Sequence, residues 1–232
     1  AGKRGRIHVF LGTSKIHREF KFGKAQDEIL RLAVEGVRRA RGFVEDVEFS
    51  PEDASRTELD FLTKIVEAAI AAGATTINMP DTVGYATPEE YGRMFRHVIE
   101  NAKGARDAIF SAHCHNDLGL AVANSLAAVR NGARQVECTI NGIGERAGNA
   151  ALEEVVLALR TRRDCFPDVE TGVNAQAIGK SSRAVPRLCG CLVQHNNDIV
   201  CPKAWAHSAG SRQARSLKEP TPSRIRPPQH SG

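Results

Sequence analysis

The chain has 232 residues, 41% of them hydrophobic and 25% charged, and contains no apolar run long enough to span a bilayer. We therefore expect a cytoplasmic globular protein with a buried core and no membrane partner. No basic segment followed by an apolar one opens the sequence, so no secretory signal is predicted, and a start inside a longer protein is expected.

The formal net charge of +5 comes from the end of the chain. Residues 1–201 carry 26 basic and 26 acidic side chains, whereas residues 202–232 carry six basic residues and Glu219 alone. The six bases are scattered among Pro and Ser, with Trp205 as the only aromatic residue for base stacking. Nucleic acid is therefore not an expected partner.

The six cysteines are expected to be reduced thiols, because nothing directs the chain to an oxidising compartment. Cys189, Cys191 and Cys201 lie close together in the sequence. They lack the paired C-x₂₋₄-C spacing of structural zinc sites, so buried structural cysteine is the favoured interpretation.

Short apolar runs alternate with amphipathic stretches from residue 7 to about residue 162, which is typical of βαβ units and a parallel sheet. Helix starts are predicted at Ser50-Pro51 and Thr87-Pro88, where a capping hydroxyl precedes proline. A helix after Thr57 is expected to stop at Gly73. The predicted strands are Ile7–Leu11, Asp46–Phe49, Thr75–Met79, Ala108–Ala112 and Gln135–Ile140.

A closed (β/α)8 TIM barrel has about eight such units in about 250 residues. The five units found here predict the α/β fold of a truncated TIM barrel. Residues 1–163 are expected to form the partial barrel, residues 164–201 a segment after the barrel, and the Pro-rich residues 202–232 a disordered tail. Two open sheet edges would then favour self-association.

Loops that follow parallel barrel strands meet at one mouth, so their polar clusters are candidates for one shared site. His113 and His115 are two residues apart at a strand end, which places both imidazoles on one side, where they could hold one metal ion. Two histidines satisfied by hydrogen bonds are the alternative. Asn116, Asp117 and Gly119 directly after them favour the metal site.

A glycine-rich run, residues 142–149, follows the last predicted strand, and its backbone N–H groups could approach an anionic or carbonyl-bearing ligand. A dinucleotide loop would need a further glycine and a later acidic residue in an early unit. The run therefore does not predict NAD binding.

The segment from Phe110 to Ala123 resembles the second signature of the isopropylmalate and homocitrate synthase family. Residues 46–56, 73–85 and 135–149 resemble the same family, and the resemblance extends from residue 1 to about residue 201. It implies a transferase that condenses acetyl-CoA with a 2-oxo acid, 2-oxoisovalerate in leucine biosynthesis. It also implies a divalent metal (Mn²⁺ or Mg²⁺, with Zn²⁺ as a third option) and a homodimer.

The resemblance also implies roles for individual residues. His113 and His115 match the metal ligands, and Asn149 matches a residue close to the metal. Glu145, near the acetyl-CoA thioester, and Glu52 and His8, in the keto-acid pocket, are the catalytic candidates. The substrate-binding candidates are Ser50, Thr82, Gly142, Gly144 and Gly148.

The reaction chemistry agrees with these residue types, since a metal and hydroxyl donors would stabilise an alkoxide and a base must remove a methyl proton. No covalent nucleophile is needed, and Cys114 should point away from the two histidines.

The chain also departs from the family. Nothing resembles its Asp-x-x-Leu-Arg-Asp-Gly motif, which supplies a metal-binding acid, and Arg212 replaces a catalytic histidine. We therefore expect weak metal binding and little activity from this chain, and an inactive remnant or a fragment that needs a partner is the alternative. A sibling citramalate or homocitrate synthase would share every motif. A lyase or biotin-dependent carboxylase of the same superfamily would lack the Gly-x-Gly-Glu-Arg loop.

Overall fold

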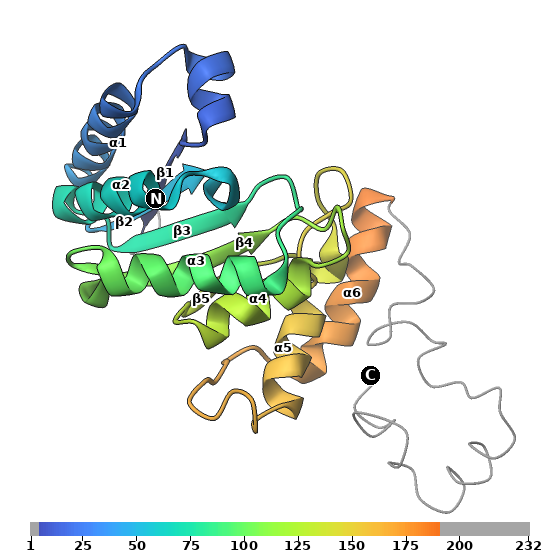
Figure 1. Cartoon of the computed structure of the whole chain (residues 1–232). Helices are drawn as coiled ribbons and strands as arrows, with labels where there is room; N and C mark the ends of the chain where they lie inside the picture. The colour runs from blue at the N-terminus through green and yellow to red at the C-terminus, as the bar shows by residue number, and fades with distance from the viewer. Residues whose placement is uncertain (1–4, 191–232) are drawn as a thin grey trace, which may run out of the picture. The chain divides into compact units, whose positions relative to one another are not determined.

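The computed structural model describes residues 5–190 (Figure 1). The chain divides into two compact units. The first comprises the residues up to Cys138 together with Gly144–Ala150, and the second comprises Thr139–Ile143 and the residues from Ala151 onward.

The first unit is built on a five-stranded sheet in which the strands follow the sequence order and every neighbouring pair is parallel. This confirms the predicted parallel α/β architecture. All five strand predictions agree with the structure to within three residues at each end. The strands are β1 (Arg6–Gly12), β2 (Asp46–Glu52), β3 (Thr76–Asp81), β4 (Ile109–Cys114) and β5 (Gln135–Glu137).

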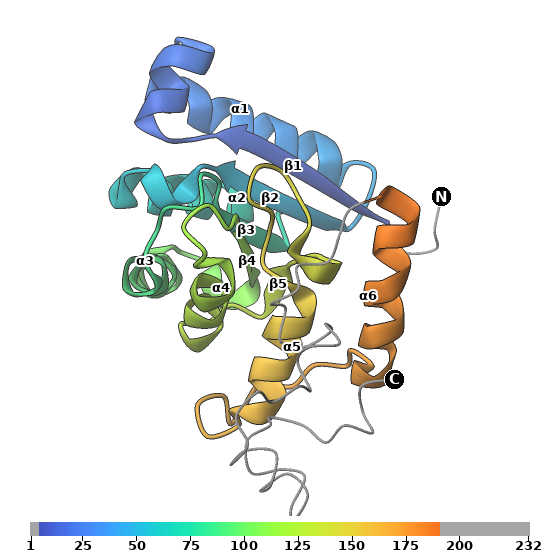
Figure 2. The same cartoon turned by 90° about the vertical axis from the view of Figure 1, so that its right-hand side faces the viewer.

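Four long helices of this unit pack side by side in chain order (Figure 2). Each connects one parallel strand to the next, as right-handed βαβ crossovers require. They are α1 (Gln26–Arg41), α2 (Leu59–Ala72), α3 (Pro88–Asn101) and α4 (Ala121–Arg130), with shorter helical turns η1 (His17–Phe22), η2 (Ala54–Arg56) and η3 (Ala105–Asp107).

Strand residues alternate between an apolar and a polar set, because successive side chains point to opposite faces of a sheet. In β2, Val47 and Phe49 are fully buried apolar residues, whereas Glu48 and Ser50 between them are buried polar residues. Glu48 and Ser50 are joined through hydrogen bonds to polar side chains of β1, β3 and β5. The polar face of the sheet is therefore where a site can form.

The predicted helix boundaries are partly right. Thr87 caps α3 with a complete capping box, and Gly73 ends α2 with a φ of 114°, as expected. The helix start predicted at Ser50 is wrong, because β2 continues to Glu52 and α2 begins only at Leu59. Residues between them form a short 3₁₀ turn instead of the first turn of the helix.

The last predicted strand, Gln135–Ile140, is too long. β5 ends at Glu137, and Ile140–Gly142 form the short helical turn η4, in which Asn141 has a φ of 62°. A residue in the left-handed region of φ/ψ space cannot continue a strand. The strand was predicted too long because Ile140 is apolar, as strand residues commonly are.

The second unit contains the helices α5 (Leu152–Thr161) and α6 (Ala175–Cys189), which pack against one another and against η4. Asn141 donates a 3.0 Å hydrogen bond to the backbone carbonyl of Ser182 on α6. The boundaries expected near residues 163 and 201 remain predictions. The tail 202–232, with Arg212, lies outside the described residues.

Within residues 5–190, no helix combines the length and the apolar character needed to cross a membrane.

Candidate active site

The two histidines of β4 meet on one side of the strand. The Nε2 atoms of His113 and His115 are 3.1 Å apart, and the two rings meet edge to face with centroids 4.9 Å apart. The two-residue strand period thus persists through the end of β4, as the sequence pattern requires. The lone pairs of the two Nε2 atoms can therefore be directed at one point in space.

Cys114, between the histidines, is completely buried on the opposite face. Its thiol lies beside Tyr91 of α3 and Ser125 of α4, and burial raises its pKa to about 12. Such a thiol stays protonated near neutral pH and cannot act as a thiolate nucleophile. The expected orientation of Cys114 is confirmed.

The loop Gly144–Ala150 adds Asn149 to the histidine pair. It lies along the end of β4 as a short antiparallel bridge between His115 and Asn149. Two backbone hydrogen bonds hold the bridge: Asn116 N–H to Gly148 at 2.9 Å and Ala150 N–H to Cys114 at 3.1 Å. Three residues predicted from two separate motifs therefore lie together.

Arg146 fastens this loop to the ends of two strands. Its guanidinium donates to both carboxylate oxygens of Asp117, at 2.8 and 2.9 Å, and to the backbone carbonyl of Thr82 at 2.7 Å. The charge of Arg146 in turn keeps the pKa of Asp117 below its usual value. The hydroxyl of Thr82 accepts a 2.9 Å hydrogen bond from the N–H of Asp53, so Thr82 belongs to the same rim.

Glu145 is not brought to the histidine pair. Its side chain is 78% exposed, and its carboxylate lies 3.8 Å from the guanidinium of Arg146. Gly144 and Gly148 lie in the loop beside the histidines, whereas Gly142 belongs to the second unit.

Three hydrogen bonds and one ion pair cross the polar face of the sheet from β1 to β4. His8 Nε2 lies 2.6 Å from the Ser50 hydroxyl, and Asn78 donates to Ser50 at 3.0 Å and to Glu137 at 3.1 Å. Glu137 then lies 3.0 Å from Nδ1 of His113. The substrate-binding candidate Ser50 and the catalytic candidate His8 are thereby linked to the histidine pair.

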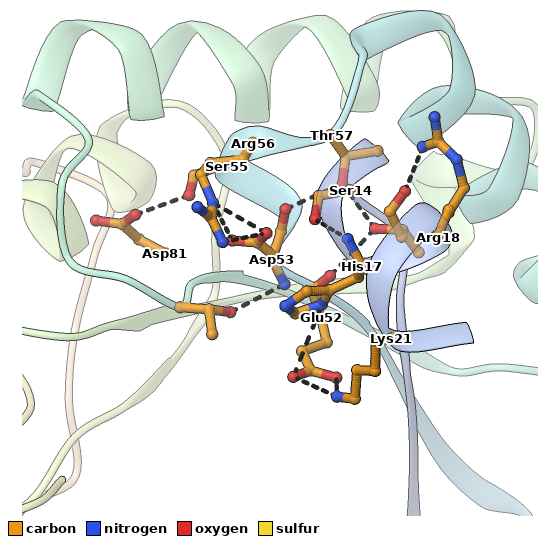
Figure 3. Close-up of polar contacts among 12 residues, drawn as sticks. Ser14, His17, Arg18, Lys21, Glu52, Asp53, Ser55, Arg56, Thr57 and Asp81 are labelled. Atoms are coloured by element: carbon orange, nitrogen blue, oxygen red, sulfur yellow. Dashed lines mark hydrogen bonds and ion pairs between the residues drawn. The ribbon is translucent and has the colours of Figure 1, made fainter. Parts of the chain in front are cut away.

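Glu52, the third catalytic candidate, makes other contacts (Figure 3). Lys21 of η1 donates to both of its carboxylate oxygens, at 3.0 and 3.1 Å, and Nδ1 of His17 lies 3.9 Å away. Among the described residues no contact joins Glu52 to His8 or to His113. Glu52 therefore lies at the rim, one strand repeat beyond Ser50.

Sequence reasoning gave no individual role to two carboxylates of this face, Glu48 and Glu137. Glu48 is 3% exposed and accepts hydrogen bonds from Arg6 at 2.8 Å and Gln135 at 3.1 Å. Burial, reinforced by the charge of Glu137, raises the pKa of Glu48. Burial also acts to raise the pKa of Glu137, but His113 outweighs it and keeps that pKa below its usual value. The two-residue period of a strand could have identified Glu48. It lies two residues before Ser50 and therefore on the same face of the sheet.

The histidine pair fits a divalent metal. Two imidazole nitrogens each about 2.1 Å from one ion and at right angles are about 3.0 Å apart, close to the observed 3.1 Å. Burial, with a smaller contribution from His113, lowers the pKa of His115, which favours the neutral form that binds metals. His113, His115 and Asn149 together supply imidazole and amide donors.

A second group that could hold an ion consists of His8, Glu48 and Glu137, whose ligand atoms lie within 4.8 Å of one another. Its carboxylates already accept hydrogen bonds from Arg6, Gln135 and Asn78. An ion there would compete with these donors for the carboxylate oxygens, so the histidine pair is the better candidate.

These features define a class: a parallel α/β protein of the barrel type whose polar face and strand ends carry a candidate metal site. Residues 1–185 match the model of the family described as HMGL-like, so the chain belongs to that family.

The chain is 57% identical over 219 residues to a 2-isopropylmalate synthase of Methylacidiphilum infernorum, covering 94% of this chain and 43% of that protein. It is 59% identical over 214 residues to a 2-isopropylmalate synthase of Hydrogenovibrio crunogenus, covering 92% and 41%. The chain thus spans about two fifths of the length of these curated relatives.

Solved structures of lower identity share the fold. A hydroxymethylglutaryl-CoA lyase from Pseudomonas aeruginosa aligns with a TM-score of 0.66 at 18% identity, covering 92% of this chain and 68% of the other. The HMG-CoA lyase from Bacillus subtilis also has a TM-score of 0.66, at 19% identity, covering 83% and 66%. The TIM-barrel fold class is confirmed.

Proposed function

We propose that this chain is the metal-binding catalytic part of a 2-isopropylmalate synthase, a cytoplasmic acyltransferase of leucine biosynthesis. The reaction joins the methyl carbon of acetyl-CoA to the keto carbon of 2-oxoisovalerate, and thioester hydrolysis then releases CoA. The observation that carries the proposal is the convergence of the two Nε2 atoms of His113 and His115, with Asn149 bridged to the same strand end. The high identity to proteins named 2-isopropylmalate synthase supports this reaction over others of the family.

His113 and His115 would hold the divalent ion, Mn²⁺ or Mg²⁺, with Asn149 as a direct or water-mediated neighbour. Such an ion, when bound, polarises a keto carbonyl and stabilises the developing alkoxide. A hydroxyl donor next to that oxygen would add to the stabilisation, and the buried hydroxyl of Ser50 is one candidate, with Thr82 at the rim as the other.

His8 is the favoured proton carrier among the three catalytic candidates. The buried Ser50 hydroxyl needs an acceptor for its hydrogen, and His8 Nε2 is its only acceptor among the described residues. His8 Nε2 therefore carries a lone pair, which accepts the Ser50 hydrogen and would take up that proton if the hydroxyl passed it on. Glu52 would act at the rim, and Glu145, which is exposed, could meet the thioester from the loop that also carries Gly144 and Gly148.

Metal binding and thiol release together test the proposal. Mn²⁺ binding is measured on the purified chain, and CoA release from acetyl-CoA is followed with a panel of 2-oxo acids. We expect Mn²⁺-dependent release that is fastest with 2-oxoisovalerate and absent in His113→Ala.

Three outcomes distinguish the alternatives. Fastest release with pyruvate or 2-oxoglutarate would identify a citramalate or homocitrate synthase. Mn²⁺ binding without release from any oxo acid would identify an inactive remnant. Failure to bind Mn²⁺ would contradict the proposed site.

A further inference from the structure

Glu137 and His113 are register partners across the parallel pair β4 and β5. Oε2 of Glu137 lies 3.0 Å from Nδ1 of His113, and both side chains are about 70% buried, with exposures of 30% and 26%. The pair lies within ion-pair distance but outside hydrogen-bond geometry. An ionised carboxylate only accepts hydrogen bonds, so a hydrogen on Nδ1 is the arrangement that avoids repulsion between two lone pairs. The Nε2 atom of His113 then keeps its lone pair, and this is the atom that faces His115.

Asn78 of β3 holds the same carboxylate oxygen from the other side. Its side chain is almost completely buried, and Nδ2 donates to Oε2 of Glu137 at 3.1 Å and to Ser50 at 3.0 Å. The amide cannot be turned round, since its oxygen would then face a carboxylate that has no hydrogen to donate. Asn78 therefore fixes Glu137 and couples it to the Ser50–His8 pair.

We propose that Glu137 and Asn78 are positioning residues of this site, with Glu137 fixing the tautomer and ring orientation of His113 and Asn78 fixing Glu137. The inference rests on the proposed function, in which His113 is a metal ligand. A carboxylate that accepts from the far nitrogen of a ligating histidine makes that histidine a better ligand and holds its ring in place. Neither residue was given a role from the sequence.

The competing interpretation makes Glu137 itself a ligand, together with His8 and Glu48. The ligand atoms of those three residues lie close enough to share an ion. The two interpretations differ in what His8 does, because His8 ligates the ion in one and is three hydrogen bonds from Glu137, through Ser50 and Asn78, in the other.

The first experiment reads the tautomer of His113 by ¹⁵N NMR on the full 232-residue chain, with His113→Asn to assign its signals. We expect a protonated Nδ1 and an unprotonated Nε2 in the wild type. Glu137→Ala should shift His113 toward the Nε2-protonated form, while the control Glu35→Ala, at an exposed position of helix α1, should leave it unchanged. An Nε2-protonated His113 in the wild type, or no change in Glu137→Ala, would overturn the proposal.

The second experiment measures Mn²⁺ affinity by electron paramagnetic resonance. Glu137→Ala should weaken binding about 10- to 100-fold. Glu137→Gln should weaken it less, because its amide oxygen still accepts from Nδ1, and this conservative variant serves if the alanine variant fails to fold. Asn78→Ala should keep the tautomer and lose affinity several-fold.

His8→Ala separates the two interpretations. Unchanged Mn²⁺ affinity supports the positioning role, whereas a loss as large as that of Glu137→Ala would make Glu137 a ligand and overturn the proposal. If the wild-type chain binds no Mn²⁺, the proposed function fails, and the tautomer experiment still decides whether Glu137 positions His113.

Discussion

Gly144 lies so close to Asn149 that no side chain fits between them. A Cβ atom at position 144 would be 2.1 Å from Nδ2 of Asn149 and 3.3 Å from its backbone nitrogen. The first distance is far inside van der Waals contact. A glycine is therefore required at position 144 by packing against Asn149.

We predict that Gly144→Ala displaces the Asn149 side chain and weakens Mn²⁺ binding about tenfold, which corresponds to about 1.4 kcal/mol. Gly172→Ala is the matched control, because nothing lies within 4 Å of a Cβ atom at that position. Titration of Mn²⁺ into both variants checks this. Equal affinities for the two variants would mean that Asn149 does not contribute to the metal site.

Arg146 should govern how firmly the loop Gly144–Ala150 is held. Arg146→Ala removes the paired hydrogen bonds to Asp117, a surface interaction of up to about 1 kcal/mol. We expect the amides of Asn116 and Ala150, which hold the loop to β4, to exchange with solvent up to about fivefold faster.

Arg162→Ala is the control for this change. Arg162 also donates two hydrogen bonds to one carboxylate, that of Asp164, at 2.8 and 2.9 Å. Hydrogen exchange of the Asn116 and Ala150 amides should be unaffected by it. If Arg146→Ala leaves their exchange unchanged as well, Arg146 does not fasten the loop.

The Arg18–Glu58 pair predicts a pH dependence of stability. Two hydrogen bonds from Arg18, at 2.7 and 2.9 Å, lower the pKa of Glu58 in the folded protein. A carboxyl group with a lowered folded pKa contributes stability above its unfolded pKa, about 4.3, and this is lost as the pH falls through the folded value. Because Glu58 is 46% exposed, the contribution should be below about 1 kcal/mol.

Urea unfolding between pH 7 and pH 3 measures this contribution. The free energy of unfolding should fall at low pH, and Glu58→Gln should be less stable at pH 7 but lose less on acidification. A variant whose stability falls as steeply as that of the wild type would exclude the pair as a cause.

The sequence predicted those features of the fold that depend on local chemistry. The capping box at Thr87 and the glycine stop at Gly73 need only neighbouring residues, and both occur as expected. Ser50 carries the same Ser-Pro signal as a helix start, yet β2 continues through it. There the pairing of β2 with β1, which extends to Glu52, overrides the local signal.

The candidate site was also predictable only in part. His113, His115 and Asn149 came together because strand ends of a parallel sheet meet at one edge. Glu137 and Asn78 were missed because their roles follow from the register between strands. That register places Glu137 beside His113, and no pattern within one strand shows it.

The free edge of β1 predicts self-association of the chain. β1 is the outermost strand of the sheet and pairs only with β2 among the described strands, and Phe10 on it is 67% exposed. An unpaired strand edge with an exposed aromatic residue favours pairing with another chain. We expect oligomers or aggregates in size-exclusion chromatography with light scattering. Phe10→Lys should shift the distribution toward monomer, whereas the control Phe43→Lys, at a position after α1 that is 74% exposed, should not. A wild-type chain that elutes as a monodisperse monomer would show that this edge does not drive association.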